Sequence, residues 1–301
     1  MLIKWDAVEL FLAYLAGTVK AADVLAHPAY VAVRLHSRLA WGRELRADDL
    51  DRAVAGQESP FFGLRDVRDN TGRIRDFVAL ARSQERQWVQ DVYSQLAPVT
   101  SRADLALTKV YPIVGYDAGI GLSGLACLNI NWPIYLGRPH EFVYMMAHEL
   151  SHVLYGRRRP IPEISQVQGS AQWSGLFDRM TQDEGFAVHA SLELRTERGH
   201  LGNGSHPILY DYVVLSQPEL LAAHVACWRR ARRTIATANG RDRSVYLELV
   251  FGAQRLTYRV GAAIARRIAE VHGRDRLKEA FAMSGTEFVE AYSELVAEKV
   301  Q

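Results

Sequence analysis

The segment His148-Glu149-Leu150-Ser151-His152 holds the residues whose types and spacing most directly suggest chemistry. Histidines four positions apart on a helix lie one turn above each other on the same face, so both imidazoles can bind one metal ion. Zn²⁺ accepts imidazole ligands, and a glutamate beside them can take a proton from metal-activated water. The spacing therefore predicts that His148 and His152 bind one zinc ion and that Glu149 is the general base.

A catalytic zinc site needs a third protein ligand. The extended pattern H-E-x-x-H-x-x-G-x-x-H fails, because Tyr155 and Arg158 stand where its glycine and third histidine would be. A downstream carboxylate is then expected, and the candidates are Glu163, Asp183, Glu184 and Glu193, with the loop residue His206 as a further possibility. Glu184 is preferred, because Gly185 and Ala187 would let its helix pack closely against the metal-binding helix.

The motif lies in an apolar stretch that predicts a helix over residues 141–155, ended by Gly156 and the following arginines and proline. A helix of this composition is buried, and buried histidines and carboxylates need partners, which a cation supplies. The alternative is a surface helix that carries two unrelated histidines.

Two strands are expected just before this helix, over residues 105–114 and 125–132, separated by a glycine-rich stretch. In the second strand, Asn129 and Asn131 alternate with apolar residues and so share one face. Residues 119–124 match G-x-G-x-x-G, but strand sequence follows where a dinucleotide-binding fold needs a helix. A glycine-rich connection is the simpler interpretation.

The rest of the chain has mostly helical periodicity. Helices are expected through residues 5–96, over 181–197, 218–238 and 253–271, and from Ser284, where Glu287 completes a capping box. The predicted fold class is α+β and mainly helical, with a small sheet packed on the metal-binding helix. The predicted domains are a helical N-terminal lobe over residues 1–100 and a catalytic domain over 101–301.

Composition limits the classes of partner. The 301 residues are 49% hydrophobic and carry a formal net charge of +2, which argues against a nucleic-acid-binding or membrane-surface protein. The chain contains no run of 18 apolar residues and no secretory signal pattern, so we expect a cytoplasmic protein that does not span a membrane. Its two cysteines, Cys127 and Cys227, are expected to be reduced and buried.

Together, the H-E-x-x-H helix and a glutamate from a second helix resemble the gluzincin group of zinc peptidases. The E-G-F-A sequence at residues 184–187 is similar to the third-ligand segment of bacterial zinc-dependent peptidase domains of undefined function. The resemblance covers about residues 105–271. It implies a zincin-like domain in which His148, His152 and Glu184 bind zinc and Glu149 is the base.

The same resemblance implies two further elements. The 125–132 strand would be the edge strand that pairs with an extended peptide, and Asn129 and Asn131 would face the substrate. Tyr258, near the start of a helix, would donate its hydroxyl to the oxyanion, and Tyr210, Tyr212 and His206 are spare candidates for that role.

The sequence therefore predicts a zinc-dependent peptidase with one zinc ion and a peptide or protein substrate. Two alternatives stay open. One is a catalytically silent zinc-binding or peptide-binding regulatory module, and the other is a zinc hydrolase that acts on a non-peptide amide. The sequence favours no particular oligomeric state.

Overall fold

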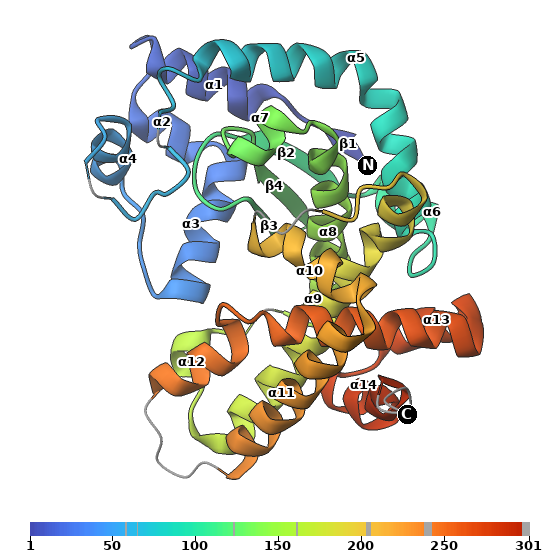
Figure 1. The fold of residues 1–301 in the computed structure, drawn as a ribbon. Coiled ribbons are helices and arrows are strands. Elements are labelled where there is room, and N and C mark those ends of the chain that lie inside the picture. The colour runs from blue at the N-terminus through green and yellow to red at the C-terminus, as the bar shows by residue number, and fades with distance from the viewer. Residues whose placement is uncertain are drawn as a thin grey trace. The chain divides into compact units, whose positions relative to one another are not determined.

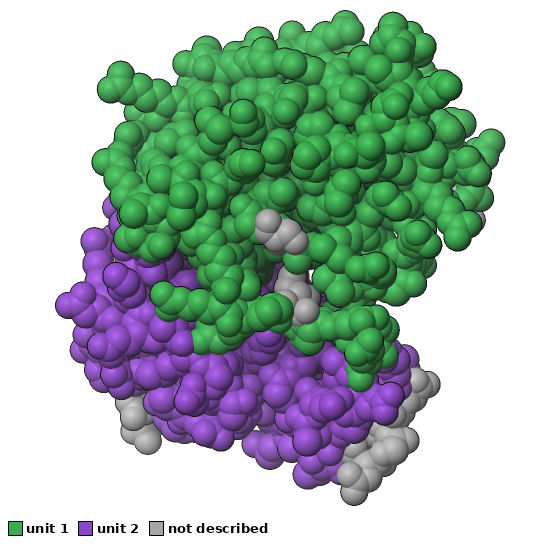
Figure 2. Space-filling model, turned by 180° about the vertical axis from the view of Figure 1, so that it is seen from behind, with its two compact units in different colours: residues 1–94, 101–166 green, residues 95–100, 167–301 purple. Residues whose placement is uncertain are grey.

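The computed structural model describes residues 1–57, 59–64, 66–122, 124–160, 162–202, 206–237 and 243–296 (Figure 1). The chain divides into two compact units, which Figure 2 colours separately. Unit 1 comprises Met1–Ser94 and Ser101–Gln166, and unit 2 comprises Gln95–Thr100 and Val167–Gln301. This division falls elsewhere than the domain boundary expected near residue 100, which stays a prediction. The mainly helical α+β class is confirmed.

Unit 1 contains the sheet. Its strands in the described residues are β1 (Leu2–Ile3), β2 (Lys109–Ile113), β3 (Gly119–Leu122) and β4 (Leu125–Asn129). The strand order is β1-β2-β4-β3; β1 and β4 are each parallel to β2, and β3 is antiparallel to β4. Both predicted strands are present but shorter, because a short helix precedes β2 and another follows β4.

The strand at the edge of the sheet is not the one that the sequence predicted. β4 lies between β2 and β3, so the expectation that residues 125–132 form an edge strand is wrong. β3, inside the glycine-rich stretch expected to be only a connection, is the strand at this end of the sheet. Alternate glycines weaken a strand signal, yet they permit close approach of a neighbouring backbone.

The helices of unit 1 confirm the helical pattern expected for the N-terminal part. They are α1 (Asp6–Leu15), α2 (Ala21–Ala26), α3 (Pro28–Trp41), α4 (Ala47–Val54), α5 (Thr71–Leu96), α6 (Arg102–Ala106), α7 (Pro133–Gly137) and α8 (His140–Gly156), with a 3-10 turn, η1 (Ile164–Gln166). α8 packs on β3 and β4, which confirms the predicted contact between the sheet and the H-E-x-x-H helix.

α8 is the central buried helix of unit 1. Every residue from Glu141 to Tyr155 is buried except His152, which is half-buried. The structure thus confirms the helix expected over residues 141–155 and excludes the alternative of a solvated surface helix.

Unit 2 is helical. Its helices are α9 (Gly169–Glu197), α10 (Pro207–Ser216), α11 (Pro218–Thr237), α12 (Arg243–Phe251), α13 (Leu256–Ala282) and α14 (Gly285–Tyr292), followed by the 3-10 turn η2 (Ser293–Val296). α9 begins at Gly169 rather than near residue 181. α13 is interrupted at Gly273, whose φ is 83°, and the predicted capping box of Ser284 and Glu287 is present.

α9 and α13 form the most extensive helix contact among the described helices of unit 2. A Cβ at Gly185 would overlap the backbone of Gly261 and lie 2.9 Å from the backbone nitrogen of Ala262. The small residue after Glu184 therefore permits close packing against α13, and not against the metal-binding helix as expected. Gly261 faces this contact from α13, and a Cβ there would likewise overlap the backbone of α9 at Thr181.

Within the described ranges, no helix is both long enough and apolar enough to cross a lipid bilayer. Both cysteines are free thiols, with Cys127 buried and Cys227 only half-buried.

Candidate metal centre

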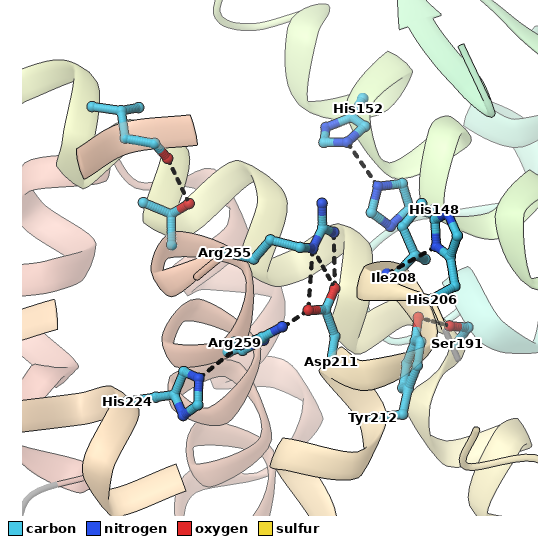
Figure 3. Close-up of polar contacts among 12 residues, drawn as sticks. His148, His152, Ser191, His206, Ile208, Asp211, Tyr212, His224, Arg255 and Arg259 are labelled. Atoms are coloured by element: carbon cyan, nitrogen blue, oxygen red, sulfur yellow. Dashed lines mark hydrogen bonds and ion pairs between the residues drawn. The ribbon is translucent and has the colours of Figure 1, made fainter. Parts of the chain in front are cut away.

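α8 presents its two motif histidines to each other (Figure 3). The Nε2 atoms of His148 and His152 lie 3.3 Å apart, and the ring planes are inclined by 81°. Two nitrogens that each lie about 2.0–2.1 Å from one ion at a tetrahedral angle are separated by about 3.3 Å. The pair therefore has the spacing that one zinc ion requires.

Glu184 of α9 completes a group that could hold a metal ion. One ligand atom from each of His148, His152 and Glu184 lies within 4.8 Å of the other two. Within the ranges that the structure describes, this is the one group of histidine, cysteine and acidic side chains with that property. The preferred third ligand is thus the acid that the structure brings to the histidines.

The other candidates for the third ligand are engaged elsewhere or lie outside this group. Glu163 is exposed and accepts hydrogen bonds from Ser165 and Gln166. Glu193 is exposed and 3.4 Å from Arg274. His206 immediately precedes α10, and its Nδ1 accepts a hydrogen bond from the backbone nitrogen of Ile208 (Figure 3). Asp183 is buried on α9 and is not part of the group.

The donor set fits zinc. Two imidazoles and one carboxylate form the ligand set of many catalytic zinc sites, in which a fourth position stays open for water or substrate. Glu149 and Glu184 are only 5% and 8% exposed. A buried carboxylate is costly unless a cation or hydrogen-bond donors compensate its charge, and a divalent ion would supply part of that compensation.

The Glu149 side chain lies against the edge strand. A Cβ at Gly119 would be 2.5 Å from Oε1 of Glu149, and a Cβ at Gly121 would be 2.8 Å from Cβ of His152. Both positions of β3 must therefore be glycine for α8 to lie where it does. Burial, followed by the negative charge of Glu149, raises the pKa of the Cys127 thiol on β4.

Tyr258 of α13 lies beside Glu184. Burial and then the charge of Glu184 raise the pKa of Tyr258 well above its ordinary value, and a hydrogen bond to Glu184 adds to the shift. Arg255 opposes this shift. The hydroxyl is therefore protonated at neutral pH and directed at a predicted ligand carboxylate. Its role as an oxyanion donor stays a prediction.

The spare candidates for the oxyanion role have other contacts. The hydroxyl of Tyr212 is 2.8 Å from that of Ser191 (Figure 3), and the Tyr210 ring lies under the guanidinium of Arg259. Burial and the nearby Arg255 lower the pKa of His206.

Asn129 and Asn131 are buried in the structure. Oδ1 of Asn129 accepts hydrogen bonds from the backbone nitrogens of Gly115 and Asn131, and Nδ2 of Asn131 donates to the carbonyl of Gly63. At 1% and 2% exposure, the two amides hold loops of unit 1 together. Their predicted contact with substrate stays a prediction, and these contacts do not favour it.

Of three features around the candidate site, two have weak sequence signals and one has none. Alternate glycines in a strand could have indicated that Gly119 and Gly121 lie against another backbone. Arg255 precedes Tyr258 by only three positions, so the two side chains are close in the sequence as well as in the structure. The burial of Asp211 beneath Arg255 has no local signal, because the two lie 44 residues apart.

Comparisons with models of protein families, with curated proteins and with solved structures each found no match to this chain. The structural finding on its function is therefore the His148, His152 and Glu184 group, which could hold a metal ion.

Proposed function

We propose that this protein is a zinc-dependent hydrolase that cleaves peptide bonds. The observation that carries the proposal is the convergence of one ligand atom each from His148, His152 and Glu184 within 4.8 Å. The distance between the two imidazole nitrogens, which suits a single ion at tetrahedral geometry, supports it.

The residues of this chain divide the chemistry among them. Zinc bound by the three ligands would supply Lewis acidity, which polarises a carbonyl and lowers the pKa of water. Glu149 is next to His148 in the sequence, and its carboxylate would accept a proton from the attacking water and deliver it to the leaving amine. The hydroxyl of Tyr258 hydrogen-bonds Glu184, and as charge develops on the oxyanion it would transfer this hydrogen bond to that oxygen.

β3 is suited to hold an extended peptide. It is the strand at one end of the sheet and pairs with β4 along one side. A substrate in strand conformation would pair with its other side through backbone hydrogen bonds. Gly119 lies against the Glu149 carboxylate, so a scissile bond that passes this position would be near the base.

The test combines zinc analysis with cleavage of a peptide library. The wild-type protein should bind one equivalent of zinc and cleave some library members. Glu184→Gln should bind zinc much more weakly, whereas the control Glu193→Gln, an exposed acid on the same helix, should behave like the wild type.

Each other outcome contradicts part of the proposal. One equivalent of zinc with no cleavage would favour a zinc-holding regulatory module. Cleavage of small non-peptide amides alone would favour a different hydrolase. If Glu184→Gln and the wild type bind zinc with equal affinity, Glu184 is not the third ligand and the proposal is wrong.

A further inference from the structure

We propose that the buried ion pair between Asp211 and Arg255 is a positioning device that holds Tyr258 against Glu184 and so sets the affinity of the site for zinc. The inference rests on the proposed function. Neither Asp211 nor Arg255 is assigned a contact with zinc or substrate.

Asp211 on α10 anchors the network. Its carboxylate is fully buried, and it accepts a hydrogen bond from Nε of Arg255 at 2.9 Å while Nη2 of Arg255 lies 2.8 Å away (Figure 3). Nε of Arg259 donates to the same carboxylate at 2.9 Å. A fork of charge-assisted hydrogen bonds fixes orientation as well as distance, which a single bond does not.

Arg255 is held in an unusual backbone conformation. It is the residue immediately before α13, and its φ of 45° lies in the left-handed region. That region costs free energy for a residue with a Cβ and persists where surrounding contacts compensate for it. The bonds to Asp211 are such contacts, so this ion pair fixes both the side chain of Arg255 and the start of α13.

The fixed position of Arg255 in turn restricts the side chain of Tyr258. The centre of its guanidinium lies 3.5 Å from the centroid of the Tyr258 ring, one helical turn further along α13. Stacking of a planar guanidinium on an aromatic face restricts the plane of the ring. The hydroxyl of this ring hydrogen-bonds Glu184. The order of contacts is therefore Asp211, Arg255, Tyr258 and Glu184.

The charges of these residues are consistent with the same series of contacts. Asp211 carries one negative charge, whereas Arg255 and Arg259 carry two positive charges. His224, whose Nε2 lies 2.7 Å from Nη1 of Arg259, cannot offset the excess, because an imidazole carries no negative charge. Glu184 is a second negative charge that acts on Arg255, with a smaller effect than that of Asp211.

The expected consequence is a dependence of zinc binding on residues that do not bind zinc. Groups that orient metal ligands from behind typically change metal affinity by about 10- to 100-fold when they are mutated. Arg255→Lys keeps the charge but loses the planar fork and the stack on Tyr258. We expect it to raise the zinc dissociation constant about tenfold and to lower kcat, with little change in KM.

A second ion pair of unit 2 provides the matched control. Nε and Nη2 of Arg232 on α11 donate to Asp178 on α9 at 2.8 and 2.9 Å, and Asp178 is 3% exposed. Arg232→Lys disturbs an arginine–carboxylate fork whose buried acid, Asp178, lies on the same helix as Glu184, and it leaves Tyr258 untouched. We expect it to lower the melting temperature as Arg255→Lys does, but to keep the zinc dissociation constant within about twofold, since no orienting group of a ligand is altered.

The experiment measures zinc affinity by competition with a chromogenic chelator, together with the visible spectrum of the cobalt-substituted proteins, which reports ligand geometry. A weaker zinc affinity and an altered cobalt spectrum for Arg255→Lys, but not for Arg232→Lys, are the expected results. If Arg255→Lys does not fold, Asp211→Asn, which keeps the shape of the side chain, carries the same test.

Two failures are distinguishable. If the wild-type protein binds no zinc, the proposed function itself is wrong. If the wild-type protein binds zinc and cleaves peptide while Arg255→Lys and Asp211→Asn match the zinc affinity and cobalt spectrum of Arg232→Lys, only the positioning role is overturned.

Discussion

Gly119 and Glu149 are packed so closely that a Cβ on the glycine would lie 2.5 Å from Oε1 and 2.7 Å from Cγ of the glutamate. The edge strand therefore leaves space for the carboxylate only because position 119 has no side chain. The predicted base of the reaction therefore lies directly against the backbone of β3.

Gly119→Ala should displace the Glu149 carboxylate while both histidines stay on the same helix. We expect kcat to fall at least tenfold, zinc to be retained, and the free energy of unfolding to fall by about 1–3 kcal/mol from overpacking. Steady-state kinetics with zinc analysis tests this. Gly72→Ala on α5, where no atom lies within 4 Å of the added Cβ, is the control. Equal activity of both variants would contradict the account of Gly119.

Glu149→Gln should keep zinc and lose hydrolysis. The amide has nearly the shape of the carboxylate but cannot accept the proton, and loss of a general base typically costs about 10²- to 10⁴-fold in rate. The measurement is turnover of a cleavable peptide by zinc-loaded protein. Turnover at the wild-type rate would exclude Glu149 as the base.

Gly185→Ala should separate α9 from α13, because a Cβ there overlaps the backbone of Gly261. We expect a loss of about 1–3 kcal/mol in the free energy of unfolding and weaker zinc binding, since Glu184 moves with its helix. Gly175→Ala on the same helix meets no atom within 4 Å and should stabilise the protein by up to about 1 kcal/mol. Denaturant unfolding of both variants measures these free energies. Equal stabilities of the two variants would contradict the close contact between the glycines.

His189 should make the protein sensitive to acid. Burial and then the charge of Arg266 lower the pKa of His189 from 6.5 to about 4, although Glu270 opposes the shift. Its buried Nδ1 has no hydrogen-bond partner among the described residues. Between pH 6.5 and 4 the unfolded chain binds the proton more readily, so stability is lost as the pH falls through this range.

His189→Gln should lose less stability than the wild type between pH 6.5 and 4. The difference between the two proteins in free energy of unfolding should be constant above about pH 7.5, where the unpaired histidine is neutral in both states. Urea titrations at several pH values test this. Parallel curves for the two proteins across the whole range would show that His189 does not titrate as described.

The sequence predicted the parts of the site that depend on local spacing. The turn of a helix alone fixes the relation of His148 to His152, and the apolar residues around them predict a buried helix. Glu184, the acid preferred from the sequence, belongs to the group that could hold a metal ion, but the helix packing expected at Gly185 was only partly right. Gly185 did indicate a close contact, and its partner was a glycine on α13 rather than α8.

Features that depend on distant pairing were not predictable in this way. Which strand lies at the end of a sheet depends on pairing with segments far along the chain, such as β1 with β2. The amides of Asn129 and Asn131 alternate as on an exposed strand face, but the Gly63 backbone, more than 60 residues earlier, covers them. Asp211 and Arg255 become neighbours only through the packing of α10 against α13.

The most direct test of the central claim is a crystal structure of the zinc-loaded protein with anomalous diffraction at the zinc edge. The account predicts one anomalous peak, about 2.0–2.2 Å from Nε2 of His148, Nε2 of His152 and a carboxylate oxygen of Glu184. A peak coordinated by other residues, or no peak within reach of these three side chains, would contradict it.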